Sequence, residues 1–314
     1  MSKLSDEIRE NMRKLAEYKE ARKKKQQPVE PEPQHLLTRL TFDKFARFIY
    51  EKTGIVMKET KRTLLSNRLR RRLKALALDS FNEYWSYLQQ PRQLKQELPF
   101  FLDVVSTNET YFRRGTNHFD ILQRHVFTEF ARQNKSHLHI WSAGCSTGEE
   151  PYDLAITVDQ YHRQHRHRFY ANILATDISK EVLDYARRGE YADRKIAKLD
   201  RTLRERHFNR ISPEESSLKF AHDVLKVKDS LKRLVNFRFL NLMKDSYPPG
   251  QDVIFCRNVL IYFDRETQNS VLNKMYNSLN HGGYLMIGHS ETLQIHDTQF
   301  KTRRMKEGVC YQKA

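Results

Sequence analysis

The sequence has few cysteines, no long apolar run and no leader-like N-terminus, and each absence excludes a class of protein. Its three cysteines form no C-x-x-C pair and cannot all pair with one another, which indicates a reduced intracellular protein. No apolar run approaches the roughly 20 residues that a membrane-spanning helix needs. The chain opens MSKLSDEIRE, with acidic residues at once, so we expect a cytoplasmic protein that is neither secreted nor inserted in a membrane.

What the chain does have is length and positive charge. Its 314 residues predict about two domains with an ample core. Lys and Arg number 56 and Asp and Glu number 39, a formal net charge of +17, and the mean hydropathy is −0.78. The low hydropathy indicates that a charge-rich segment dilutes an ordinary globular part. The positive charge suits nucleic acid, an acidic protein surface or an anionic membrane face, so its place along the chain decides its meaning.

The first third of the chain divides into a charged tail and a helical domain. Residues 1–35 have the pattern of a lone charged helix followed by a proline-rich linker. Residues 36–110 follow helical spacing, which predicts an all-helical domain of about four helices. Within this domain Gly54 is a natural helix stop, and Ser80 with Glu83 forms a capping box.

Residues 111–314 change to strands that alternate with helices. The apolar segments LHIWSAG, YANILATD, NFRFLNL, QDVIFCRN and YLMIGHS predict strands, with helices between most of them. This alternation is typical of an α/β fold with a mostly parallel sheet covered on both faces. Residues 190–235 interrupt the alternation with a polar insertion that is poor in strand signals.

One helix of the expected helical domain carries an unusual charge. Between Lys58 and Lys74 there are eight basic residues and a single acid, Glu59. The leucines of this helix recur at helical spacing and face the core, so the basic side chains are expected to project outward as a basic ridge. A solvated face would mix the two signs, so we interpret the ridge as a docking surface for an acidic partner, with simple solvated decoration as the alternative.

The first predicted strand of the α/β part is followed by a loop with two glycines and two acids, SAGCSTGEEP. Gly144 and Gly148 allow a sharp turn, but the spacing is neither G-x-G-x-x-G nor that of a P-loop. Glu149 and Glu150 at the start of the next helix would repel a pyrophosphate and can receive a cationic amine. The alternative is that both acids only complement the positive end of the helix.

The second predicted strand ends in Asp177. An acid at the carboxyl end of such a strand can accept hydrogen bonds from both hydroxyls of a ribose. It could instead cap the next helix, although Ser179 already meets that need. A ribose acceptor and an amine acceptor beside a tight glycine turn describe a nucleoside with a positively charged amino-acid tail. That description fits S-adenosylmethionine better than NAD.

Six segments in order, NETYFRR, WSAGCSTGEEPY, LATDIS, FLNL, IFCRNVLIYF and GGYLMIGHSETL, resemble the chemotaxis receptor glutamate methyltransferases, the CheR family. The resemblance runs from about residue 38 to the C-terminus. It implies an all-helical domain before a Rossmann-like methyltransferase domain, with the insertion as a small β-subdomain. It also implies an enzyme that methylates glutamate side chains on the cytoplasmic helical bundle of bacterial chemoreceptors, with S-adenosylmethionine as methyl donor and S-adenosylhomocysteine as product.

The resemblance further implies which residues form the site. The cofactor-binding residues would be Asn108, Thr110, Arg114, Glu149, Glu150, Asp177, Asn241, Leu242, Arg257 and Asn258. Arg114 and Tyr262 would lie beside the departing methyl group as the catalytic residues. Arg68, Arg71 and Arg72 of the basic ridge would steer the enzyme onto the glutamate-rich receptor bundle.

Two departures from the family pattern leave questions open. Arg113 stands where many relatives have a second aromatic residue, so a shift of one residue would give Arg113 the role of Arg114. No glycine lies between Gly189 and Gly250, whereas relatives that bind a receptor tail peptide carry glycines in one turn of this insertion. We therefore expect no tethering to a receptor tail. We also expect a monomer without a metal site.

Two other functions remain open at the level of the sequence. An RNA or DNA methyltransferase on the same fold would suit the charge, but the sequence has no N-P-P-Y segment to hold a flipped base and no cysteine pair suited to chemistry at base C5. A non-catalytic sensor could keep the nucleoside pocket alone. The presence of Asn108, Asp177 and Tyr262 argues against such a sensor.

Overall fold

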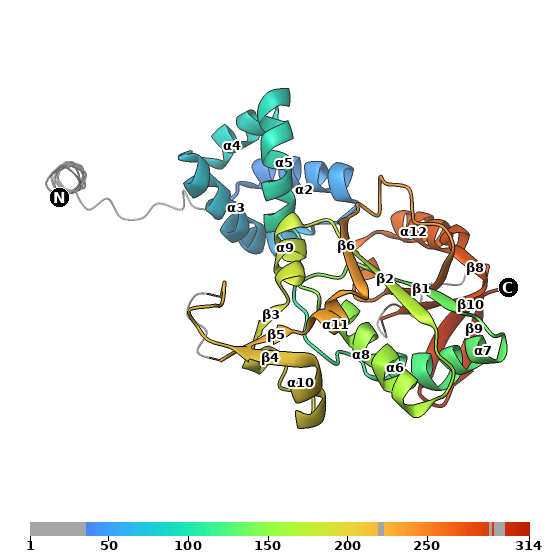
Figure 1. Cartoon of the computed structure of the whole chain (residues 1–314). Helices are drawn as coiled ribbons and strands as arrows, with labels where there is room; N and C mark the ends of the chain where they lie inside the picture. Colours follow the sequence, from blue (N-terminus) through green and yellow to red (C-terminus); the bar gives the residue numbers. More distant parts are fainter. Residues whose placement is uncertain (1–35, 219–222, 289–290, 292–298) are drawn as a thin grey trace, which may run out of the picture.

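The computed structural model describes residues 36–218, 223–288, 291 and 299–314 (Figure 1). The expected charged helix and linker of residues 1–35 lie outside the described residues. The described chain forms a helical domain and a large mixed sheet flanked by helices, with a small three-stranded sheet to one side (Figure 1). Within these ranges, no helix combines the length and the apolar character needed to cross a bilayer.

The helical domain contains four helices, α2 Arg39–Thr53, α3 Arg62–Leu76, α4 Phe81–Leu88 and α5 Pro91–Val105. The predicted end of α2 is confirmed, since Gly54 adopts a left-handed backbone with φ of 75°. The predicted cap of α4 is also confirmed, because Ser80 Oγ accepts the N–H of Glu83 at 3.2 Å. The Glu83 carboxylate reaches back to the N–H of Asp79 rather than to that of Ser80.

The basic ridge on α3 is turned partly inward. Arg72 forms a two-pronged ion pair with buried Glu97 of α5, with Nε–Oε1 at 2.7 Å and Nη2–Oε2 at 2.9 Å. Arg68 donates to the carbonyl of Val105 at 2.8 Å. The expectation that the ridge arginines project outward is therefore wrong for these two, because acceptors distant in sequence draw them in. Arg71 is exposed, as expected.

The main sheet has seven strands in the order β6-β2-β1-β7-β8-β10-β9. Their bounds are β1 His137–Ala143, β2 Tyr170–Asp177, β6 Val235–Phe239, β7 Gln251–Cys256, β8 Leu279–Ile287, β9 Phe300–Met305 and β10 Gly308–Lys313. The five strands from β6 to β8 pair in parallel, and β10 pairs antiparallel with both β8 and β9. The five predicted strands and the mostly parallel sheet are confirmed. The sequence patterns did not predict the C-terminal hairpin.

Helices cover both faces of this sheet (Figure 1). They are α6 Asn117–Ile121, α7 Phe127–Arg132, α8 Glu149–Gln164, α9 Lys180–Arg188, α11 Asp229–Lys232 and α12 Arg265–Ser278. On one face, Ile140 and Phe255 of the sheet pack in one core with Ile156 of α8. On the other, Trp141 of β1 packs in a second core with Met275 of α12. Two cores on opposite faces fix the positions of the strand ends between them.

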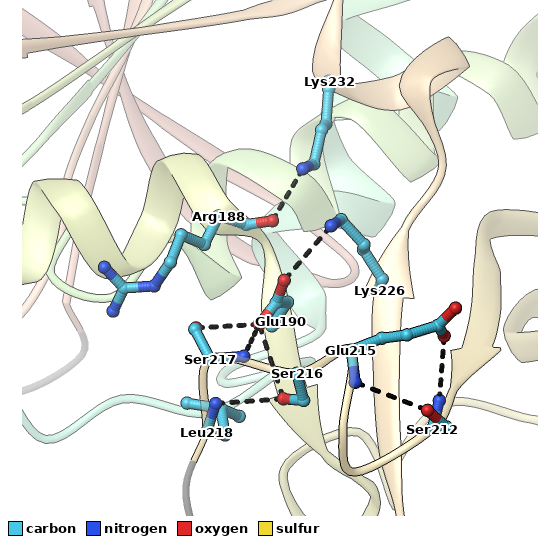
Figure 2. Close-up of polar contacts among 9 residues, drawn as sticks. All are labelled: Arg188, Glu190, Ser212, Glu215, Ser216, Ser217, Leu218, Lys226 and Lys232. Carbon is cyan, nitrogen blue, oxygen red and sulfur yellow. Dashed lines mark hydrogen bonds and ion pairs between the residues drawn. The ribbon is translucent and has the colours of Figure 1, made fainter. Parts of the chain in front are cut away.

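The insertion forms a small antiparallel sheet in the order β3-β5-β4, with bounds β3 Glu190–Ala192, β4 Phe208–Ile211 and β5 Val224–Val227, and with the helix α10 Arg201–His207. The implied β-subdomain is thus present, and its strands are too short to give a clear alternation in the sequence. Figure 2 shows how Glu190 ties the chain after β4 to β3. Its carboxylate accepts the N–H and Oγ–H of Ser217, both at 2.8 Å, and pairs with Lys226 at 3.1 Å.

The topology opens a crevice where the strand order reverses. The chain passes from β1 to β2 on one side and later returns to β7 on the other, so the loops after β1 and β7 diverge at the carboxyl edge. The helical domain closes one side of this crevice. The N–H of Val56 donates to the carbonyl of Tyr262 at 2.8 Å, and Asn241 Nδ2 donates to the carbonyl of Lys52 at 2.7 Å.

Candidate functional site

A pocket lies at the carboxyl edge of β1, β2 and β7. It encloses about 1030 Å³ of space that is open to solvent. Thr53 at the end of α2 and Ile55 just after it form one wall. Further lining comes from segments 106–111, 144–146, 177–178, 240–242 and 257–263. Because this volume includes open solvent, the residues that line the pocket, and not its size, indicate what it can hold.

Most of the predicted site residues meet in this pocket. Its lining includes Tyr262 and nine of the ten predicted cofactor residues: Asn108, Thr110, Arg114, Glu150, Asp177, Asn241, Leu242, Arg257 and Asn258. Glu149 is not part of the lining. Of the predicted docking residues, Arg68 and Arg71 border a separate cavity that shares Ser106 and Asn108 with the first.

The adjacent acids Glu149 and Glu150 point to different partners. Glu149 is fully buried and pairs with Lys195 of the insertion, at 2.9 Å between Oε1 and Nζ. Glu150 faces the pocket, where its two oxygens accept from Ser142 Oγ at 2.7 Å and from Arg257 Nη1 at 3.1 Å. Burial raises the pKa of Glu150, and these two partners oppose that rise. The two carboxylates therefore point in different directions, and of the two only Glu150 can receive a group inside the pocket.

The loop after β1 is held tightly against β2. The N–H groups of Gly144 and Cys145 both donate to the carbonyl of Thr176, at 2.8 and 2.9 Å. Gly144 has a φ of 78°, and a Cβ there would lie 2.4 Å from a methyl carbon of Val259. Only glycine tolerates both the positive φ and the close approach of Val259, and this lets the loop lie between the ends of β2 and β7.

Asp177 at the end of β2 is oriented by backbone donors. Its Oδ2 accepts the N–H of Ser146 at 2.9 Å, and its Oδ1 accepts the N–H of Ser179 at 3.0 Å. Burial raises the pKa of this carboxyl, and the backbone N–H groups counteract the rise. Each oxygen keeps a further lone pair for a hydroxyl in the pocket.

The two neighbouring arginines occupy different environments. Arg114 lines the pocket, donates from Nη1 to the carbonyl of Glu109 at 2.9 Å and lies 5.7 Å from the ring centroid of Tyr111. Arg113 is not part of the lining, and its guanidinium lies 3.4 Å from Gln160 Oε1. The sequence left open a shift of the role to Arg113. In this fold the Arg113 side chain points to Gln160 and not into the pocket.

Arg257 is buried and links Glu150 to the turn at Arg114. Besides Glu150, it donates from Nη2 to the carbonyl of Arg114, and it lies 5.5 Å from the ring centroid of Phe119. It passes so close to Gly115, at a φ of 62°, that a Cβ there would lie 2.3 Å from Nη2. The position of Arg114 thus depends on Arg257.

Sequence reasoning assigned no role to Glu291, which shapes the loop after β7. This nearly buried carboxylate accepts the N–H groups of Asn258, Val259 and Ile261 at 3.0, 3.0 and 3.2 Å. It holds the loop that carries Tyr262. The signal was its place in the segment GHSETL, but nothing in the spacing says that it binds a loop about thirty residues earlier in the chain.

Asn241 and the cysteines have little freedom to act on a ligand. The Asn241 amide donates to Lys52, and its Oδ1 accepts the N–H of Met243 at 2.9 Å, so it fastens the wall of the pocket. Cys145 and Cys256 are buried, and burial raises the pKa of both thiols well above their usual value. Neither is activated as a nucleophile.

The groups in the pocket fit S-adenosylmethionine. Asp177 suits a ribose, Arg114 suits a carboxylate, and Glu150 suits an ammonium group. A further acid, Asp153, also borders the pocket, and its Oδ1 is buried without a hydrogen-bond partner among the described residues. The sequence analysis did not select Asp153, although it follows Glu150 by three residues on the same helix face.

Comparisons with known proteins agree with this assignment. Two family models match, "CheR methyltransferase, all-alpha domain" over residues 40–106 and "CheR methyltransferase, SAM binding domain" over residues 108–309. The chemotaxis protein methyltransferase of Borreliella burgdorferi is 37% identical over 264 residues, which cover 82% of this chain and 90% of that protein. The chemotaxis protein methyltransferase of Salmonella typhimurium is 37% identical over 265 residues, covering 83% and 87%.

One of the solved structures that match is a distant one. Magnesium protoporphyrin IX methyltransferase from Synechocystis with bound S-adenosylmethionine covers 72% of this chain and 91% of that chain. Its sequence identity is 12% and the TM-score is 0.32, a likeness too weak to carry an argument.

Proposed function

The chain belongs to the CheR methyltransferase family, and on that premise we propose that it transfers a methyl group from S-adenosylmethionine to glutamate side chains of bacterial chemoreceptors in the cytoplasm. As a member of this family it is an S-adenosylmethionine-dependent methyltransferase of chemotaxis. The observation that carries the proposal is the pocket, which collects Glu150, Asp177, Arg114 and Tyr262 at one edge of the sheet.

Each part of the cofactor would be held by a protein group of complementary charge or polarity. Asp177 would accept the two ribose hydroxyls, and Leu242 would contact the adenine side. Glu150 would receive the ammonium group, and Arg114 would bind the carboxylate of the amino-acid tail. When bound, the cofactor supplies the methyl group from its sulfonium centre.

The acceptor needs no general base from this chain. A glutamate side chain has an ordinary pKa of about 4.3, so at neutral pH it is already the ionised nucleophile. The protein then contributes alignment of the carboxylate oxygen with the methyl group, and good alignment can lower a barrier by roughly 7–11 kcal/mol at best. We assign this positioning to Tyr262 and Arg114.

Tyr262 is placed for that task, since it borders two cavities. One is the cofactor pocket, and the other is a neighbouring cavity whose lining includes Lys58, Lys61 and Phe263 together with the acids Asp264 and Glu291. The ammonium of Lys61 lies 5.6 Å from the Tyr262 ring centroid. We propose that the acidic acceptor enters through this second cavity, past the two lysines, and meets the methyl group beside Tyr262.

Receptor docking is assigned chiefly to Arg71. Arg68 and Arg72 have partners within the protein, whereas Arg71 is exposed and borders the cavity that shares Asn108 with the cofactor pocket. Replacing Arg71 with Glu should lower kcat/KM for a receptor fragment by roughly 3- to 10-fold at low salt, because steering toward the acidic bundle is lost. The loss should fade at high salt, where the Debye length falls well below about 10 Å.

The matched control for this prediction is Lys306→Glu. Lys306 is exposed in the turn between β9 and β10, and the substitution changes the net charge equally. These two strands lie on the other side of the molecule from α3 (Figure 1). Initial methylation rates measured over a salt series compare the two variants. Equal losses in both would mean that net charge, and not docking at Arg71, controls the rate.

We also propose that this enzyme does not tether to a receptor tail peptide. The insertion has no glycine between β3 and Gly250, and the chain after β4 is already tied down. Ser212 and Glu215 bond to each other there, and Ser217 bonds to Glu190 (Figure 2). A receptor fragment with or without its last residues should therefore be methylated at the same rate.

The test of the proposed function is transfer of a labelled methyl group from S-adenosylmethionine. A chemoreceptor cytoplasmic fragment, with and without its tail, and RNA are offered in parallel. Label that appears on the receptor and is released by mild base identifies a glutamyl ester. Tyr262→Phe should lower turnover roughly 10- to 100-fold with unchanged cofactor affinity, since one hydrogen bond to a charged group is lost.

Tyr170→Phe is the matched control, since Tyr170 is exposed at the start of β2, away from the pocket. Label on RNA would replace the proposal with nucleic-acid methylation. Tight cofactor binding without any methyl transfer would replace it with a sensor.

A further inference from the structure

Asp153 is a buried acid in the pocket with no role in the scheme above. It lies in the first turns of α8, its exposed fraction is 1%, and it borders the cavity together with Glu150. Residues three apart on a helix share a face, so the two carboxylates point toward the same part of the pocket. That part is the one assigned to the amino-acid tail of the cofactor.

Only one of the two Asp153 oxygens is occupied. Oδ2 accepts the N–H of Arg113 at 2.6 Å, which supports the turn that precedes Arg114. Oδ1 is buried and has no hydrogen-bond partner in the described part of the chain. A buried oxygen of a carboxylate without a partner is costly, so a native protein that keeps one usually has a use for it.

The arginine side chains near Asp153 make their hydrogen bonds to other groups, although Arg257 Nε is also buried without a partner among the described residues. Arg113 and Arg257 attract its negative charge, and Glu150 repels it. The Arg113 guanidinium bonds to Gln160, and Arg257 bonds to Glu150 and to the carbonyl of Arg114. Neither arginine bonds to Oδ1. The free oxygen is therefore available to a cationic donor that enters the pocket.

We propose that Asp153 Oδ1 accepts a hydrogen bond from the ammonium group of the cofactor's amino-acid tail, so that Asp153 and Glu150 bind this ammonium together. The inference rests on the proposed function, because it names a second acid of the same cofactor site. An ammonium group has three donors, and two carboxylates on one helix face can accept two of them. Asp177, another acid of the pocket, remains for the ribose.

Binding of the cofactor should then depend on pH. Burial raises the pKa of Asp153 to about 7, against the opposing effect of Arg113 and Arg257. Only the ionised carboxylate attracts the ammonium, so the affinity should rise as the pH rises through 7. With a pKa near 7, the ionised fraction grows roughly eightfold from pH 6.0 to 7.5, and the affinity should follow. A proton is released on binding wherever Asp153 starts protonated.

Calorimetric binding of two probes tests this inference. S-adenosylhomocysteine carries the amino-acid tail, and 5′-methylthioadenosine lacks it. Asp153→Asn should weaken S-adenosylhomocysteine binding at pH 7.5 about tenfold and remove most of its pH dependence. Affinity for 5′-methylthioadenosine should stay unchanged, which shows that the pocket is still folded. Asp153→Ser is the second variant, since its hydroxyl can still accept from Arg113.

Two results would overturn the inference. One is an Asp153→Asn protein that binds S-adenosylhomocysteine with the affinity and pH dependence of the original. The other is an equal loss for both probes in both variants, which would mean that Asp153 only supports the fold. Failure of the proposed function looks different, because it would leave tail-dependent binding intact while the receptor fragment receives no methyl group.

Discussion

Replacing Arg257 with methionine should destabilise the folded protein by about 3–5 kcal/mol, because the Glu150 carboxylate then remains in a site that is closed to water on most sides. The Arg257 side chain is 5% exposed and the Glu150 side chain 14%. The carbonyl of Arg114 also loses its donor. For a domain of about this size, that loss lowers Tm by roughly 6–20 °C.

The pH dependence of the variant follows from the pKa of Glu150. Burial already raises this pKa in the intact protein, and removal of Arg257 deletes the first of the effects that oppose the rise. A carboxyl whose folded pKa is raised is most favourable for folding below its unfolded pKa, and this stability is lost as the pH rises through the folded pKa. The deficit of Arg257→Met should therefore be smaller at pH 5 than at pH 8.

The double variant Arg257→Met with Glu150→Gln separates the two roles of the pair. Removing the charge of both partners should recover most of the lost stability, since no buried charge is left alone. It should not restore full cofactor affinity, because Glu150, one of the two acids assigned to the ammonium, is gone. Thermal unfolding and calorimetry measure the two outcomes. If the double variant is as unstable as the single one, the ion pair is not the reason for the loss.

Local signals allowed much of the fold to be predicted. Gly54, Ser80 and Ser179 end or cap helices in the structure because each satisfies backbone groups within a few residues of itself. The buried strands of the parallel sheet can be recognised in the sequence as apolar runs. Both kinds of information are short-range, and a sequence displays them directly.

The basic ridge shows where such prediction stops. The helical spacing of α3 places its leucines correctly, but it cannot reveal that Glu97, 25 residues later, takes Arg72 inward. The Arg72 guanidinium pairs with a carboxylate that also accepts from Tyr84 at 2.8 Å. The direction of the Arg72 side chain depends on the position of Glu97, and that position depends on how α3 and α5 pack.

The same limit applied to predicting which acids of the site face the ligand. The sequence placed Glu149 and Glu150 together at a helix start, but which of them faces the ligand depends on Lys195 in the insertion, 46 residues away. Asp153 was overlooked because an acid three residues after Glu150 also fits an ordinary solvated helix face. Its significance comes from the oxygen that the folded chain leaves without a partner.

Replacing Arg114 with alanine should lower kcat/KM for the cofactor by roughly 100- to 1,000-fold. The Arg114 guanidinium lines the pocket and still has donors free after its bond to Glu109, so it can bind a carboxylate with two charge-assisted hydrogen bonds. Loss of both costs about 3–4 kcal/mol, which corresponds to that fold-change. Methyl transfer under subsaturating cofactor measures the effect.

The neighbouring arginine supplies the matched control. Arg113→Ala removes the same side chain one position earlier, where it contacts Gln160 outside the pocket, and keeps the backbone N–H that binds Asp153. At pH 8, above the pKa of Asp153, this variant should lose less than about threefold in kcat/KM, since only a weak contact and a secondary attraction on Asp153 disappear. A larger loss in Arg113→Ala than in Arg114→Ala would reverse the assignment and give Arg113 the catalytic role. Because both side chains are alike in charge and size, their difference reports only where the fold directs each one.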